Sequence, residues 1–273
     1  MTACAVFATC VFTACGDDDP TTPGNPDPTG SLINPNAVFT GKRVGNFDGN
    51  KMTYNEEGLL TKIESTYETV TFTYPTATRS AGNTGVHVIM TIKGNDPVDG
   101  GKTSIDMTIG KNGFVESAIE TYDDDPTDTD TWGFKYNEEG QLNWMKRSEG
   151  DNEITTITYK DGDITKVEVS DDEYPEPDRA IIAYGSNPSE NKGCIMLFDE
   201  TFSIDMDEMW YAYWAGLLGK ATKHLPISQT FESTWNGTTT KSTYEFEWNF
   251  TVDGYPKDMT IDHSYTETIH FGW

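Results

Sequence analysis

The chain has 273 residues, of which 35% are hydrophobic and 12% are aromatic, a length that is ample for a hydrophobic core. Its 45 acidic residues outnumber its 19 Lys and Arg residues, so the formal net charge at pH 7 is −26. This charge argues against nucleic acid as a partner, because phosphates need Lys and Arg, and against electrostatic adsorption to an anionic lipid surface.

The first residues have the composition of a secretory signal that ends at a cysteine. Residues 5–14 are largely apolar, and Cys15 is followed by the run Gly-Asp-Asp-Asp-Pro. An apolar stretch of about 7–15 residues ended by small residues is typical of a signal peptide, whereas a transmembrane helix needs about 20 apolar residues. Residues 1–14 contain no Lys or Arg, so we expect the basic start of the signal to lie further upstream. We predict a signal peptide over residues 1–15.

Cys15 and its surroundings resemble the lipid-attachment site of bacterial lipoproteins. The resemblance implies cleavage before Cys15, a diacylglyceryl group on its sulfur, and a membrane partner reached through that anchor. The acidic residues 17–19 resemble the export signal of Bacteroidetes-type surface lipoproteins. The expected localisation is therefore the outer membrane, exposed on the cell surface, and a periplasm-facing position is the alternative.

The rest of the chain divides into a tether and one domain. Residues 16–36 are rich in Pro, Gly, Asp, Thr and Asn and cannot bury enough apolar surface to offset the entropy of ordering them, which predicts a flexible tether. Residues 37–273 are predicted to form a single antiparallel β domain with a helical insert. Cys194 is the one cysteine of this domain, so no intrachain disulfide is expected and the residue is interpreted as a buried structural thiol.

A strand, a turn closed by glycine, and a second strand recur along the domain. The turns contain Asn or Asp and end at Gly58, Gly113, Gly140, Gly162 and Gly254. Asn and Asp bond locally to the backbone and glycine adopts positive φ without steric cost, so each unit predicts a β-hairpin. Apolar and polar residues also alternate over 244–252, as in a strand with one face in water. The predicted fold class is all-β and mainly antiparallel: a highly curved sheet or open barrel built of tandem β-hairpins.

Residues 206–222 show the periodicity of a helix instead. Large apolar side chains recur three and four positions apart, at Met206, Met209, Trp210, Tyr213, Trp214, Leu217 and Leu218. Asp205 and Glu208 have the spacing of a capping box, and Gly219 marks an end. We predict one long helix near 206–222 that lies across the sheet.

The hairpin units resemble the YD repeats of Rhs-like proteins. Residues 54–58 and 136–140 have the spacing Tyr-x-x-x-Gly, and residues 191–193 and 214–226 add further points of resemblance. Together these segments resemble Bacteroidetes-type surface lipoproteins of domain-of-unknown-function family 4595, which is described as having a porin-like fold. The resemblance implies a highly curved antiparallel sheet and a surface lipoprotein, and it carries over no catalytic residues. The porin-like description concerns shape alone, because the face opposite the aromatic residues is Thr, Glu and Asn, whereas a membrane barrel needs an outward apolar band.

The candidate ligand-binding residues are aromatic residues of the 206–222 segment. Trp210, Tyr211 and Trp214 combine apolar rings with polar groups, which suits an amphipathic ligand. The alternative is that these side chains belong to the core. Tyr211 falls outside the apolar stripe and is therefore predicted to be exposed to solvent.

Motifs for metals, nucleotides and catalysis are weak or missing. Asp123, Asp125 and Asp128 offer the oxygen ligands that calcium prefers, but they do not fit a calcium-loop pattern, so calcium is a weak candidate and no cofactor is predicted. The four histidines lack zinc-site spacing. No phosphate-binding glycine motif indicates a nucleotide, and no G-x-S-x-G elbow indicates hydrolysis. We therefore predict that the protein is not an enzyme.

Three functional hypotheses follow from these patterns. The first is a non-catalytic binding or interaction module on the cell surface, whose ligand is a glycan, a peptide or a surface protein. The alternative is a carrier that holds a lipid or other apolar ligand in a groove of the curved sheet, which predicts a continuous internal cavity. The second alternative is a secreted glycan hydrolase, which requires two carboxyl groups about 5–10 Å apart in an open cleft.

Overall fold

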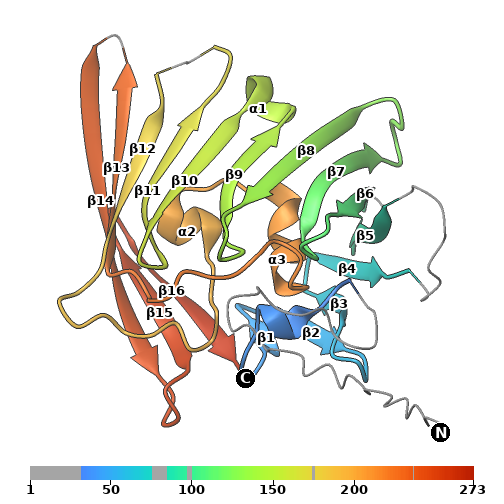
Figure 1. The fold of residues 1–273 in the computed structure, drawn as a ribbon, viewed down its shortest axis with the longest axis horizontal. Coiled ribbons are helices and arrows are strands. Elements are labelled where there is room, and N and C mark those ends of the chain that lie inside the picture. The colour runs from blue at the N-terminus through green and yellow to red at the C-terminus, as the bar shows by residue number, and fades with distance from the viewer. Residues whose placement is uncertain (1–31, 76–84, 97–99, 174–175, 236) are drawn as a thin grey trace, which may run out of the picture.

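The computed structural model describes residues 32–75, 85–96, 100–173, 176–235 and 237–273. These residues form one closed barrel of 16 antiparallel strands, with two short helices inside it (Figure 1). The strands in chain order are β1 (Asn46–Phe47), β2 (Asn50–Tyr54), β3 (Leu60–Glu64), β4 (Glu68–Thr73), β5 (Val86–Gly94), β6 (Lys102–Ile109), β7 (Val115–Tyr122), β8 (Thr129–Tyr136), β9 (Leu142–Arg147), β10 (Ile154–Lys160), β11 (Asp163–Ser170), β12 (Asp178–Ala183), β13 (Ser228–Trp235), β14 (Thr238–Phe250), β15 (Pro256–Asp262) and β16 (Thr266–Gly272). The helical segments are η1 (Pro35–Ala37), α1 (Glu149–Asn152), α2 (Phe198–Phe202), η2 (Asp207–Met209) and α3 (Trp210–Trp214).

Each strand pairs with the next strand in the sequence, and β1 closes the barrel. Asn46 and Phe47 of β1 pair with Gly272 and Phe271 of β16 on one side and with β2 on the other. The predicted all-β antiparallel fold is confirmed, and the curved sheet closes fully. Closure satisfies the backbone groups that the edges of an open sheet would leave unpaired.

Successive turns alternate between the two ends of the barrel, because each strand runs antiparallel to the one before it. We call one end the glycine end, since it carries the turns closed by Gly58, Gly113, Gly140, Gly162 and Gly254. The opposite end carries, among others, the turns at 48–49, 65–67, 148–153 and 263–265.

The hairpin turns have the chemistry that their residues predict. The five glycines of the glycine end all have positive φ, between 77° and 90°. In the turn between β2 and β3, Asn55 Oδ1 accepts a hydrogen bond from the Leu59 amide at 2.8 Å. In the turn between β8 and β9, Asn137 Oδ1 accepts one from the Gln141 amide at 2.9 Å. A substitution at these glycines would force a Cβ into a left-handed backbone that other residues rarely adopt.

Tyrosines tie neighbouring hairpins together at the glycine end. Each hydroxyl donates a hydrogen bond to a backbone carbonyl of an adjoining segment: Tyr54 to Val44, Tyr74 to Leu60, Tyr136 to Val115 and Tyr159 to Leu142, at 2.8–2.9 Å. Burial raises the pKa of the Tyr54 hydroxyl to about 12, so it stays a neutral donor. The tyrosine of the Tyr-x-x-x-Gly spacing is therefore a structural residue that holds one end of the barrel.

A single long connection fills the barrel interior. Residues 184–227 join β12 to β13 and carry α2, η2 and α3; we call this segment the plug. It is bonded to the glycine end, where the Val115 amide donates to the Leu217 carbonyl at 2.9 Å and the Lys220 amide donates to the Gly140 carbonyl at 2.9 Å. Its helices form the tip, which lies inside the ring of strands (Figure 1).

The helix in the plug is shorter than predicted. The sequence predicts a helix over 206–222, whereas the structure has one turn at η2 followed by α3, which ends at Trp214. Gly216 ends it with φ of 75°, while the Leu217 amide bonds the Ala212 carbonyl at 3.1 Å in a left-handed C-terminal cap. The terminating glycine is thus Gly216 rather than Gly219. The apolar stripe is nevertheless core, because its members other than Trp210 are at most 2% exposed.

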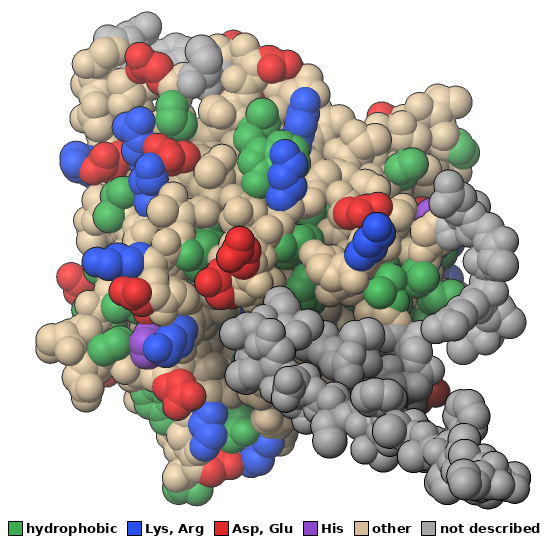
Figure 2. Space-filling view, viewed as in Figure 1, with side chains coloured by type: hydrophobic (Ala, Val, Ile, Leu, Met, Phe, Trp, Pro, Cys, Tyr) green, Lys and Arg blue, Asp and Glu red, His purple; other side chains and the backbone are tan. Residues whose placement is uncertain are grey.

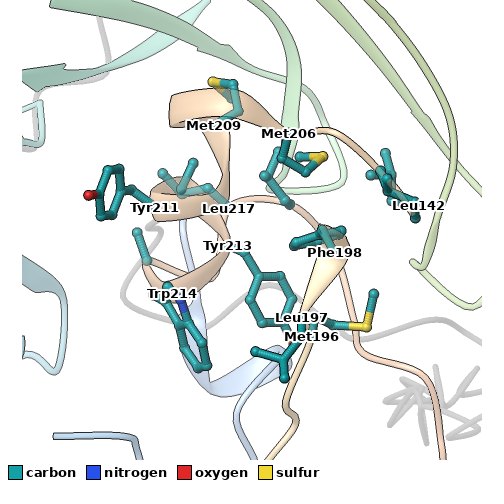
Figure 3. Packing of buried hydrophobic residues seen from close by; sticks show 14 of the residues in the cluster. Leu142, Met196, Leu197, Phe198, Met206, Met209, Tyr211, Tyr213, Trp214 and Leu217 are labelled. Carbon is teal, nitrogen blue, oxygen red and sulfur yellow. The ribbon is translucent and has the colours of Figure 1, made fainter. Parts of the chain in front are cut away.

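The packing of the plug counts against the carrier hypothesis. Within the plug, the Tyr213 ring lies 5.4 Å from that of Phe198 and 5.6 Å from that of Trp214. Figure 3 shows the three side chains close together. Tyr213 and Trp214 are among the largest fully buried side chains of the described residues. The plug therefore occupies the space in which a continuous internal cavity would have to lie.

The outer face of the barrel is mostly polar. Figure 2 shows charged side chains of both signs spread over one face, with hydrophobic side chains in small separate groups. On β14 the predicted alternation holds for Phe246, which is buried, but Phe250 is 40% exposed. A register shift between Asn249 and Phe250 interrupts the alternation at this point. No helix in the described ranges is both long enough and apolar enough to cross a membrane.

Candidate functional site

A cleft with a volume of about 550 Å³ lies at the tip of the plug. The plug contributes residues between 196 and 214, and the barrel contributes Phe47 and Glu68. Phe47 ends β1 beside the turn at 48–49, and Glu68 begins β4 beside the turn at 65–67. The cleft therefore lies toward the opposite end of the barrel, away from the tyrosines, and we call it the tip cleft.

Five aromatic residues line the tip cleft: Phe47, Phe198, Trp210, Tyr211 and Trp214. The ring of Phe47 lies 5.7 Å from that of Trp210 and 5.4 Å from that of Trp214, and the rings of Trp210 and Tyr211 are 3.9 Å apart. Trp214 is buried, whereas Trp210 is half-buried and so keeps part of its surface accessible from the cleft. The short helix α3 places the three predicted ligand-binding residues, Trp210, Tyr211 and Trp214, in one site.

The prediction that Tyr211 is exposed is wrong. Tyr211 is only 3% exposed, and its hydroxyl donates a hydrogen bond to Glu68 Oε1 on β4. Figure 3 shows its side chain pointing away from Tyr213 and from the centre of the plug. Because α3 lies inside a barrel, a residue outside the apolar stripe meets the barrel wall instead of solvent. Burial, followed by the bond to Glu68, raises the pKa of the Tyr211 hydroxyl well above its usual value.

Carboxylates form the other part of the tip cleft: Glu68, Asp199, Glu200, Asp205, Asp207 and Glu208. Arg147, at the end of β9, bonds Asp205 at 2.8 Å and Glu153 at 3.3 Å. Burial, together with a hydrogen bond to Asp207, raises the pKa of Glu208 to about 8. Burial also raises the pKa of Asp199 and of Glu200. The cleft thus combines aromatic rings with acidic groups held close together.

Glu120 on β7 is a further carboxyl group beside this acidic cluster. It is 1% exposed, its Oε2 accepts a 3.4 Å hydrogen bond from Trp132 Nε1, and its Oε1 has no hydrogen-bond partner among the described residues. Burial, and the charges of Asp207 and Asp130, raise the pKa of Glu120 to about 7. A buried carboxyl oxygen without a donor is unfavourable, so the interior next to the tip cleft lacks a donor that it needs.

The other candidate residues lie elsewhere. Cys15, like the predicted signal and most of the tether, is outside the described residues. Asp123 pairs with Lys102 at 3.2 Å, and Asp125 Oδ1 accepts a 3.1 Å bond from the Thr127 amide, so these carboxylates serve the turn between β7 and β8. Among the described residues no group of three or more His, Cys, Asp or Glu side chains is placed to hold a metal ion.

Cys194 behaves as a structural residue within the plug. It is half-buried, and burial raises the pKa of its thiol. Its carbonyl accepts a hydrogen bond from the Tyr213 hydroxyl at 2.6 Å. A raised pKa lowers the thiolate fraction, which is the reactive form, so this thiol is poorly suited to act as a nucleophile.

The sequence reasoning missed the acidic half of the tip cleft. Asp207 and Glu208 immediately precede the aromatic stripe, and this neighbourhood is a usable signal for a mixed acidic and aromatic site. Glu120 alternates with Ala118 and Tyr122 on β7, which predicts that all three point to the same face. Phe47 and Glu68 gave no signal, because their position opposite the plug depends on the closure of the barrel.

A plugged, closed antiparallel barrel with a mostly polar outer face defines the structural class of this protein. The particular family follows from the sequence match: the chain belongs to the family described as "Domain of unknown function (DUF4595) with porin-like fold", which it matches over residues 50–257. The resemblance to domain-of-unknown-function family 4595 is thereby confirmed. No curated protein matches the chain.

Solved structures share this fold at low sequence identity. A porin-like protein from Bacteroides uniformis ATCC 8492 superposes with a TM-score of 0.56 at 16% identity, over 82% of this chain and 88% of that chain. A porin-like protein from Bacteroides vulgatus ATCC 8482 also has a TM-score of 0.56, at 11% identity, over 85% of this chain and 98% of that chain. At these identities the likeness establishes the fold.

Proposed function

We propose that this protein is a non-catalytic binding module, held at the outer membrane and exposed on the cell surface by a lipid on Cys15. The observation that carries the binding role is the tip cleft, where a pocket of about 550 Å³ combines aromatic and polar side chains. Pockets of roughly 300–1,000 Å³ with apolar walls and a few polar groups are typical of ligand sites. The ligand class is a glycan, a peptide or a surface protein.

The hydrolase alternative gains no support from the acidic pair in the cleft. A glycan hydrolase holds its two carboxyl groups about 5–10 Å apart, with the sugar or a water molecule between them. Asp207 and Glu208 interact closely enough for Asp207 to raise the pKa of Glu208, which fits two neighbouring groups rather than a pair on either side of a sugar. We expect no turnover when the protein is screened on polysaccharides.

Binding is tested by presenting the full chain to a glycan array and to a pool of short peptides. We expect saturable binding that Trp210→Ala weakens at least about tenfold, since aromatic residues in a pocket carry much of the affinity. Trp144→Ala is the matched control, because Trp144 contacts Lys135 on the wall and does not line the tip cleft. Absence of binding to either panel would count against the proposal, as would equal losses in the two variants.

The cell-surface location rests on the junction at Cys15 and its acidic successors, and the likeness to porin-like proteins of Bacteroides agrees with it. We expect palmitate to label the expressed protein, globomycin to block its processing, and Cys15→Ser to abolish both. Cys194→Ser is the control and is expected to keep the label. If the protein is unlabelled, uncleaved and found inside the cell, the proposed cell-surface location is wrong.

A further inference from the structure

We propose that the tip cleft takes an organic cation, meaning an ammonium or guanidinium group carried on an apolar body. This inference rests on the proposed binding function and specifies the chemistry of its ligand. A small amine and a basic side chain of a peptide share that chemistry, and the experiment below separates them.

The tip cleft carries acidic groups that lack cationic partners within the described ranges. Six carboxylates line the cleft, and Arg147 is committed to Asp205 and to Glu153. Glu68 Oε1 accepts a hydrogen bond from the Tyr211 hydroxyl. In the described part of the chain no Lys, Arg or His forms an ion pair with Asp199, Glu200, Asp207 or Glu208. Glu208, whose pKa is raised to about 8, keeps its proton at pH 7, so the unpaired charge lies on the other acidic groups, and a cationic ligand supplies the positive charge that they lack.

The aromatic lining of the tip cleft also suits a cation on an apolar body. Trp210 is the half-buried member, and its ring lies against Tyr211 and Phe47. The face of an aromatic ring, tryptophan above all, attracts a cation within about 6 Å of its centre. An apolar body attached to the cation also gains from contact with the Trp210 and Phe47 rings. A bare inorganic ion would use the carboxylates and leave the rings unused.

A buried carboxyl group outside the cleft lining, Glu120, has one oxygen that lacks a hydrogen-bond donor in the described structure. Glu120 is nearly fully buried, and its Oε1 has no donor among the described residues. The charge of Asp207 raises the pKa of Glu120, and the charge of Glu120 raises the pKa of Glu208, so Glu120 interacts with the acidic groups of the cleft although it does not itself line the cleft. An ammonium group carries three N–H donors, and a guanidinium carries five. A ligand of this class therefore brings hydrogen-bond donors to a region where a buried acceptor has none.

Calorimetry with three matched probes tests the inference on the full chain. Tryptamine carries an ammonium on an indole, tryptophol replaces it with a hydroxyl, and indole-3-acetate replaces it with a carboxylate. We expect tryptamine to bind, tryptophol to bind at least about tenfold more weakly, and indole-3-acetate to show no binding. The affinity for tryptamine is expected to fall as salt is added, because the attraction is electrostatic.

The matched variants replace two carboxyl groups each by amides. Asp207→Asn with Glu208→Gln is expected to weaken tryptamine binding at least about tenfold. Glu56→Gln with Glu57→Gln is the control, since both residues are exposed in a turn at the glycine end, and it is expected to bind tryptamine normally. A lysine-containing pentapeptide separates the two kinds of ligand. Tighter binding of the pentapeptide than of tryptamine indicates that the natural ligand is a peptide with a basic side chain, and weaker binding indicates a small amine.

The outcomes separate this inference from the binding function beneath it. Equal or tighter binding of tryptophol or indole-3-acetate overturns the cation proposal and leaves a binding site in place. Displacement of tryptamine by an equal concentration of calcium ions also overturns it, because charge alone would then suffice. If none of the three probes binds and the glycan and peptide panels are also negative, both proposals fail.

Discussion

Trp214→Ala is expected to lower the free energy of unfolding by about 3–5 kcal/mol, the usual cost of truncating a large buried aromatic side chain. Trp214 is 2% exposed and packs against Phe47 of the barrel wall and Tyr213 of the plug. Its removal leaves a cavity where the plug meets β1, the two-residue strand that closes the barrel. Urea unfolding followed by circular dichroism measures the change.

Tyr67→Ala is the control for this experiment. Tyr67 is also aromatic, but it is 83% exposed in the turn between β3 and β4. A surface substitution of this kind is expected to change stability by no more than about 0.5 kcal/mol. A loss below about 1 kcal/mol for Trp214→Ala would show that the plug contributes little to the stability of the barrel.

Stability is expected to fall as pH rises through the range in which Glu120 and Glu208 ionise. The folded protein holds the pKa of Glu120 at about 7, against 4.5 for the free side chain, so it keeps a proton that the unfolded chain releases. Raising the pH above about 4.5 therefore favours unfolding, and the loss is complete near pH 7 for Glu120. For Glu208, the corresponding loss of stability continues up to about pH 8.

Glu120→Gln is expected to remove the part of this pH-dependent loss of stability that comes from Glu120. The amide retains an acceptor for Trp132 Nε1 and carries no charge, so the variant should gain on the order of 2 kcal/mol at about pH 8 and close to nothing at about pH 4.5. Glu56→Gln controls for the general effect of removing one charge from a chain with a net charge of −26. Denaturant titrations at the two pH values provide the comparison. Equal gains in the two variants would mean that the burial of Glu120 does not raise its pKa.

The local parts of the fold were predictable because each hairpin carries its own signal. Gly58 and Gly140, with the asparagines that precede them, specify turns whose geometry needs no distant contact. Closure was not predictable in the same way. β1 has only two residues, too few for any periodicity, and its pairing with β16 joins parts of the chain more than 220 residues apart.

The candidate site was predicted in part, for the same reason. The stripe that contains Trp210 and Trp214 was recognised, since helical periodicity is a local property. The predicted extent of the helix was wrong because Gly216, three residues before Gly219, already adopts the left-handed conformation. The exposure of Tyr211 was wrong because amphipathicity reports which side of a helix is most apolar, and in a helix enclosed by a barrel a less apolar side can face the barrel wall.

The central claim is that ligand enters the cleft between the tip of the plug and the barrel wall. Fluorine NMR of the full chain labelled with fluorotryptophan tests it most directly, during titration with tryptamine and with hits from the glycan and peptide panels. The resonance of Trp210, assigned by its loss in Trp210→Phe, is predicted to shift saturably while that of Trp144 on the barrel wall stays in place. Saturable shifts at Trp144 with no change at Trp210 would contradict the account.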